Sequence, residues 1–106
     1  MHKNYLGEFE ELIMLTIGVL GDESYGVSIK DEMEAQTGKK PSIGALHTAL
    51  QRLEKKGVVE SWEGGATQSR GGRKKRFYRL TAAGRASLES AHEIRNQMFA
   101  LMTKTS

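Results

Sequence analysis

Apolar residues recur at steps of three and four in a segment near the middle of the chain, residues 42–57. This spacing predicts a helix with one buried face, because successive residues advance by about 100° around a helix. The hydroxyl of Ser42 is suited to cap the first turn, and Gly57 is suited to end the helix in a left-handed conformation. The expected buried face consists of Leu46, Leu50 and Leu53, with Ile43 beside them.

The opposite face of the same segment carries small, polar and cationic residues. These are Gly44, Thr48, Gln51, Arg52 and Lys55, with His47 on the flank. A helix that lies in the major groove of DNA needs such a face, because its side chains must reach the base edges. A surface helix with a solvated polar face gives the same pattern, so residues 42–57 alone leave both interpretations open.

Two helices are predicted before this segment. Residues 6–20 are apolar almost all the way round, so we expect the core on one side and a partner subunit on the other, with a central core helix in a monomer as the alternative. Ser24 is suited to cap a second helix that runs to about Gln36. Gly26, which is costly in a helix, indicates the close approach of another backbone. With residues 42–57 these helices form a helix-turn-helix arrangement.

A β-hairpin is predicted after the third helix. Residues 58–62 are β-branched and aromatic, which favours a strand, and residues 73–80 are suited to be its partner. Residues 63–72 between them are rich in glycine and predict a loop. Trp62 is expected to pack at the base of the first strand. A hairpin directly after a recognition-type helix is a wing, so the expected fold is mainly α with a small β-hairpin.

A last helix is predicted from Ala82 to about Thr103, with Thr81 as its cap. Its apolar stripe has nothing left in the chain to cover it, although folding back onto its own domain is the alternative. We therefore expect a winged helix-turn-helix domain at residues 1–81 and a dimerisation helix at residues 82–106. The expected dimer contacts are Leu12, Leu15, Val19, Leu88, Ala91, Ile94, Met98, Phe99, Leu101 and Met102.

Charge is distributed unevenly along the chain, although its net value is only +3. Residues 1–38 carry two cations and eight acids, a net charge of −6, whereas residues 39–79 carry eleven cations and three acids, a net charge of +8. Residues 70–79 hold six cations and no acid, which favours contact with phosphates, although a plain solvated loop has the same composition. The expected DNA contacts are Lys39, Lys40, Ser42, Gly44, His47, Thr48, Gln51, Arg52, Lys55, Arg70, Arg73, Lys74, Lys75 and Arg76.

These features resemble the PadR family of bacterial winged-helix transcriptional regulators, in the short form with one C-terminal helix. The resemblance spans residues 6–88. It rests mainly on the block Ser42-x-Gly44-x-Leu46-x-x-Ala49-Leu50-x-Arg52-Leu53-Glu54-x-x-Gly57 and on the strand Arg76-Phe77-Tyr78-Arg79-Leu80-Thr81-x-x-Gly84.

The resemblance implies a homodimeric repressor that binds a pseudo-palindromic operator in double-stranded DNA through residues 42–57 and the wing, residues 63–80. His47-Thr48 stand where the family commonly has Tyr-Pro, so no operator sequence is implied. Some members are similar to sensors with a small-molecule effector at the dimer interface. In this chain Phe99 is the one aromatic residue of the last helix, which argues against such a pocket.

Several classes of protein are disfavoured by composition. Without cysteine there is no disulfide, no thiolate metal site and no cysteine nucleophile, and we expect no metal or other cofactor. The three histidines are scattered and no nucleophile lies in a recognisable turn, so an enzyme is not expected. We expect a soluble, cytoplasmic protein with no membrane partner. A winged-helix protein-interaction module without specific DNA binding stays as the alternative function.

Overall fold

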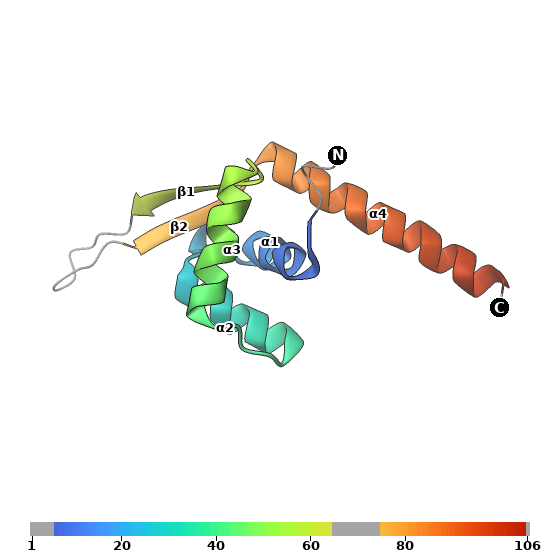
Figure 1. Ribbon diagram of the computed structural model, residues 1–106, viewed down its shortest axis with the longest axis horizontal. Helices are drawn as coiled ribbons and strands as arrows, with labels where there is room; N and C mark the ends of the chain where they lie inside the picture. The colour runs from blue at the N-terminus through green and yellow to red at the C-terminus, as the bar shows by residue number, and fades with distance from the viewer. Residues whose placement is uncertain (1–5, 65–74, 106) are drawn as a thin grey trace.

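Four α-helices and one β-hairpin make up the fold in the computed structural model, which describes residues 6–64 and 75–105 (Figure 1). The elements are α1 (Glu8–Leu20), a 3₁₀ turn η1 (Gly21–Glu23), α2 (Gly26–Thr37), α3 (Ile43–Lys55), β1 (Val59–Gly64), β2 (Lys75–Leu80) and α4 (Ala82–Thr105). The mainly helical fold class with a small hairpin and a C-terminal helix is therefore confirmed.

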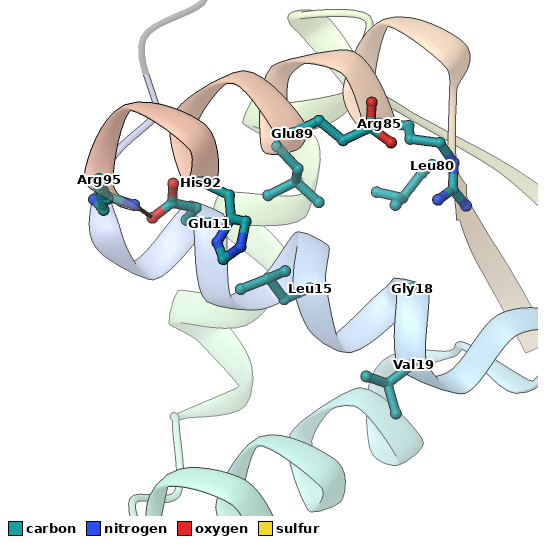
Figure 2. Close-up of a pocket in the computed structure, with 10 residues that line it drawn as sticks. Glu11, Leu15, Gly18, Val19, Leu80, Arg85, Glu89, His92 and Arg95 are labelled. Carbon is teal, nitrogen blue, oxygen red and sulfur yellow. Dashed lines mark hydrogen bonds and ion pairs between the residues drawn. The ribbon is translucent and has the colours of Figure 1, made fainter. Parts of the chain in front are cut away.

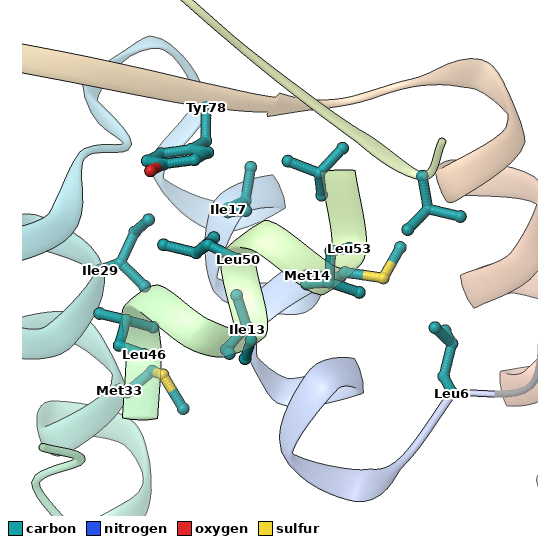
Figure 3. Close-up of a cluster of buried hydrophobic side chains, with 13 residues drawn as sticks. Leu6, Ile13, Met14, Ile17, Ile29, Met33, Leu46, Leu50, Leu53 and Tyr78 are labelled. Atoms are coloured by element: carbon teal, nitrogen blue, oxygen red, sulfur yellow. The ribbon is translucent and has the colours of Figure 1, made fainter. Parts of the chain in front are cut away.

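The hydrophobic core lies where α1, α2 and α3 meet the base of the hairpin (Figure 3). The predicted leucine stripe of α3 is fully buried there, as its spacing required. Ile43 departs from the prediction, because its side chain is 46% exposed at the first residue of α3. The other elements contribute Leu6, Ile13, Met14, Ile17, Ile29, Met33, Val58, Val59 and Tyr78 to the core.

The start of α2 is capped differently from the prediction. Ser24 is fully buried, and its hydroxyl donates to the carbonyl oxygens of Ile17 at 3.2 Å and Gly21 at 2.8 Å. The cap residue is Tyr25, whose backbone N–H donates to Oγ of Ser28 at 2.9 Å. The assignment of Ser24 as the cap was therefore wrong: its hydroxyl instead joins the end of α1 to the turn that follows.

Close approach to a glycine occurs at α4 and not at α2. A Cβ built on Gly26 would meet nothing within 4 Å, so the predicted close contact there was wrong. A Cβ on Gly84 would overlap the carbonyl oxygen of Val58 and would lie 2.9 Å from its carbonyl carbon and 3.2 Å from its Cα. Only glycine therefore allows the first turn of α4 to pack on the chain segment that enters β1.

One threonine hydroxyl joins the end of α3 to the start of α4. The Thr81 hydroxyl donates to the carbonyl oxygen of Gly57 at 2.7 Å and accepts from the backbone N–H of Gly84 at 3.0 Å. The second contact is the helix cap that the sequence predicted. Gly57 has a φ of 78°, the left-handed conformation expected at the end of α3.

The two strands are antiparallel, with Val59 opposite Leu80 and Gly64 opposite Lys75. β1 extends two residues beyond the predicted strand, and most of the predicted loop lies outside the described residues. The molecule measures 60 × 30 × 22 Å, because the C-terminal half of α4 extends away from the other helices (Figure 1).

Candidate nucleic-acid interface

The exposed face of α3 carries the polar and small residues that the sequence placed there. Ser42 caps the helix, its hydroxyl accepting from the backbone N–H of Ala45 at 3.1 Å. A Cβ on Gly44 would meet nothing within 4 Å, so the first turn is open to close approach by a ligand backbone. The exposed residues on and before this helix are Lys39, Lys40, Ser42, Ile43, Gly44, Ala45, His47, Thr48, Gln51, Arg52, Glu54 and Lys55.

Glu10 of α1 forms ion pairs with two cations at the C-terminal end of α3. Its side chain is only 8% exposed, and its carboxylate accepts from Nζ of Lys56 at 2.8 Å and lies 3.5 Å from Nη1 of Arg52. Burial raises the pKa of Glu10, but its hydrogen bonds with Lys56 and with the N–H of Gly7, together with the charge of Lys56 and the bond from Arg52, lower the pKa overall. Arg52 therefore lies on the flank of α3 that faces α1.

Sequence reasoning did not single out Glu10, because its position in the first turn of α1 has an ordinary explanation. Acidic residues are common at helix starts, where they complement the helix dipole. One feature of the sequence could have indicated a buried Glu10: it follows Phe9 on a helix that is predicted to be apolar almost all the way round, so little of that helix is left for a solvated carboxylate. A carboxylate on such a helix is costly to bury unless a cation pairs with it.

Two aromatic rings on the face of the hairpin away from the core form a row with the ring of Tyr25 at the start of α2. Trp62 stacks on Phe77 with ring centroids 5.9 Å apart and an interplanar angle of 21°, and Phe77 meets Tyr25 edge-on at 5.6 Å. Nζ of Lys75 lies 4.0 Å from the ring centre of Tyr25, and the guanidinium of Arg79 lies 5.1 Å from that of Trp62. Trp62 therefore packs along the strand pair and not at the strand base, which corrects the prediction.

Acidic residues of β1 offset part of the charge of the wing. Arg79 pairs with Glu60, and Arg76 lies 3.8 Å from Glu63. Both acids lie outside the acid-free run of residues 70–79, and only the register of the two strands places them beside its arginines. Three of the predicted contacts, Arg70, Arg73 and Lys74, lie outside the described residues.

A groove of about 450 Å³ lies between α1, β2 and α4 (Figure 2). Its floor is apolar, and an ion pair between Glu11 of α1 and Arg95 of α4 closes one end. Two predicted dimer contacts on α1, Leu15 and Val19, line the groove while staying largely exposed. The full lining is Glu11, Leu15, Gly18, Val19, Leu80, Arg85, Leu88, Glu89, His92 and Arg95.

Neither a membrane span nor a metal centre is found in the described ranges, 6–64 and 75–105. No helix there is long and apolar enough to cross a bilayer. In the same residues no three histidine, aspartate or glutamate side chains come together as metal ligands.

Three helices followed by a β-hairpin, with a polar and cationic surface on the third helix, define a winged helix-turn-helix protein of the DNA-binding class. The family model for the transcriptional regulator PadR-like family matches residues 16–90, and the chain belongs to that family. It is accordingly a DNA-binding transcriptional regulator and not an enzyme.

Individual proteins and solved structures are similar to this chain. The chain is 33% identical over 84 residues to an uncharacterized protein X of Lysinibacillus sphaericus, a match that covers 77% of this chain and 72% of the relative. A PadR family transcription regulator from Clostridium difficile has the same fold, with a TM-score of 0.71 at 24% identity over 92% of this chain and 97% of that one. The structure of a complex of hsRosR-SG is similar, with a TM-score of 0.71 at 27% identity over 93% of this chain and 80% of that one.

Proposed function

We propose that the protein is a homodimeric repressor that binds a pseudo-palindromic operator. Residues 1–81 form the DNA-binding domain and residues 82–106 the dimerisation helix. Two copies of α3 enter successive major grooves, and the two wings meet the flanking backbone or minor groove. A two-fold dimer requires half-sites separated by about one helical turn of DNA, or a multiple of it.

The observation that carries this proposal is the exposed face of α3. Thr48, Gln51 and His47 are exposed and carry groups that can donate to or accept from base edges. Ser42 and the first backbone N–H groups of α3 form a phosphate site at the helix start, because the helix dipole is positive there. The further phosphate contacts proposed are Lys39, Lys40, Arg52, Lys55, Arg70, Arg73, Lys74, Lys75 and Arg76.

The proposed dimer is supported by the apolar surface of α4. Met98 is 66% exposed and Phe99 is 63% exposed, and both lie on the half of α4 that extends away from the other helices (Figure 1). On α1, Val19 is 67% exposed beside the groove. A second α4 packed here would bury these side chains, and each large apolar side chain contributes roughly 1.5–3 kcal/mol when fully buried. The remaining proposed contacts are Leu12, Leu15, Leu88, Ala91, Ile94, Leu101 and Met102.

Selection of bound duplexes from a random DNA library is the direct test of specific binding. We expect a palindromic sequence to be enriched and to bind at least about 10³-fold more tightly than scrambled DNA. Gln51→Ala should change which bases are preferred, whereas Lys55→Ala should weaken binding to every sequence and lower the salt slope by about one. Lys104→Ala, at the far end of α4, is the matched control and should leave the base preference and the DNA affinity unchanged.

Repression is tested on the selected sequence. With the palindrome overlapping a promoter, the protein should lower transcription in a purified system, and Gln51→Ala should relieve that effect. Enrichment of no sequence, with all binding lost at moderate salt, would refute the operator part of the proposal.

A further inference from the structure

The face of the hairpin that points toward α3 carries its own set of polar side chains. In the strand register Ser61 lies opposite Tyr78, and Glu63 lies opposite Arg76. Because side chains alternate between the faces of a strand, Ser61 and Arg76 share the face on which Tyr78 is buried. They are diagonal neighbours across the two strands, a distance that a long side chain can span.

Three elements meet on this face through one serine hydroxyl. Nη1 of Arg76 in β2 donates to Oγ of Ser61 in β1 at 2.9 Å. The Ser61 hydroxyl in turn donates to the carboxylate of Glu54 near the end of α3. A hydroxyl can accept one hydrogen bond while it donates another, which alanine cannot do. The result is a continuous hydrogen-bonded connection from the wing to α3.

The charges around the buried Tyr78 are consistent with the Glu54 carboxylate pointing toward the hairpin. Burial raises the pKa of Tyr78, the negative charge of Glu54 raises it further, and the positive charge of Arg76 opposes both. Glu54 and Arg76 therefore both lie close enough to act on the Tyr78 hydroxyl from the same side of the sheet.

Fixing an arginine before it meets a phosphate has a clear energetic benefit. A long side chain loses conformational entropy when it is immobilised in an interface, and this loss weakens binding. Contacts that already hold the guanidinium in the unbound protein reduce this loss at the moment of binding. The same contacts fix the orientation of the hairpin relative to α3, on which simultaneous contact with the groove and the flanking backbone depends.

We propose that Ser61 and Glu54 are positioning residues, which hold Arg76 on the α3 side of the wing in the orientation that binds a DNA phosphate. This inference rests on the proposed function, in which Arg76 is one of the phosphate contacts. It assigns Ser61 and Glu54, neither of which carries positive charge, to the machinery that sets DNA affinity.

A double-mutant cycle on the selected operator tests the inference. Ser61→Ala should weaken binding by about three- to tenfold, as expected for loss of a hydrogen bond to a charged group at a partly exposed site. Ser61→Thr keeps the hydroxyl and suits a strand, so it should bind within about twofold of the original protein. Arg76→Gln should weaken binding and lower the salt slope by about one. In the Arg76→Gln background, Ser61→Ala should have no further effect.

The outcomes separate this inference from the proposed function. If Arg76→Gln weakens binding while Ser61→Ala binds like the original protein, the positioning role is wrong and the DNA contact of Arg76 stands. A full Ser61→Ala effect in the Arg76→Gln background, or equal losses in Ser61→Ala and Ser61→Thr, would also overturn it. If no operator is enriched, the proposed operator binding fails and the positioning role fails with it. If Arg76→Gln changes nothing, Arg76 is not a phosphate contact and the positioning role is overturned. Thermal unfolding of each variant shows whether a loss of binding reflects a loss of fold.

Discussion

The contact between the first turn of α4 and Val58 leads to a sharp prediction for Gly84→Ala. The added Cβ would overlap the Val58 carbonyl oxygen, which also accepts from the backbone N–H of Thr81 at 3.1 Å. Val58 is buried against the core, so neither side can move without disturbing packing. Overfilling a packed site costs about 1–3 kcal/mol, and here the clash is with backbone, so we expect the upper end of that range.

The same substitution at Gly44 is a matched control, because both glycines lie in the first turn of a helix. Alanine gains up to about 1 kcal/mol over glycine from its helix propensity. At Gly44 nothing opposes this gain, so Gly44→Ala should be slightly more stable than the original protein. At Gly84 the gain in helix propensity offsets part of the clash, so we expect the free energy of unfolding to fall by about 2 kcal/mol.

Urea unfolding followed by circular dichroism measures both variants, at one protein concentration because dimerisation would shift the midpoint. The midpoint should fall for Gly84→Ala and should rise or stay level for Gly44→Ala. Equal midpoints for the two variants would refute the argued contact between α4 and Val58. Gly44→Ala should also weaken DNA binding, since its methyl group projects into the open surface of α3.

Three further predictions concern other parts of the molecule. The pKa of Glu10 is lowered below its ordinary value of 4.5, so the stability that its carboxylate contributes is present above pH 4.5 and is lost as the pH falls through the folded-state pKa. At pH 7 the free energy of unfolding of the original protein should exceed that of Glu10→Gln by about 1–3 kcal/mol. Urea titrations should show this difference closing below pH 4.5. Met98→Glu should dissociate the proposed dimer in sedimentation measurements, whereas Gln97→Glu, which adds the same charge outside the apolar stripe, should leave it intact. Ile43→Ala should weaken operator binding by up to about tenfold, because its exposed side chain at the start of α3 is suited to contact a thymine methyl group, and the loss should vanish on DNA with deoxyuridine at that base.

The parts of the fold that could be predicted from the sequence are those governed by local periodicity. The spacing of the leucines in α3 predicts which side of the helix is buried. The end of the helix at Gly57 is also predictable, because glycine adopts the left-handed conformation that stops a helix and this preference depends only on neighbouring residues. The cap at Thr81 was predictable for the same reason, because a cap hydroxyl reaches a backbone N–H only three residues away.

The details that were missed depend on contacts between residues far apart in the chain. Glu10 meets its cations 42 and 46 residues later, and Gly84 meets a carbonyl oxygen 26 residues earlier. Ser24 is a plausible cap by residue type, and only the packing of the turn against the end of α1 shows that its hydroxyl bonds there and that α2 begins after Tyr25. Ile43 continues the apolar spacing, yet it precedes the part of α3 that crosses the core and therefore stays exposed.

The hydroxyl of Thr81 has a geometric consequence for any assembly built on α4. At 24 residues and about 1.5 Å per residue, α4 is about 36 Å long, so a tilt of about 5° at its first turn would displace its far end by about 3 Å. The Gly57 and Gly84 contacts of that one hydroxyl help to fix this angle where the start of α4 meets the end of α3, and the ion pair between Glu11 and Arg95 holds α4 further along its length. In a dimer joined through α4, the separation between the two α3 helices would then be controlled from this short junction.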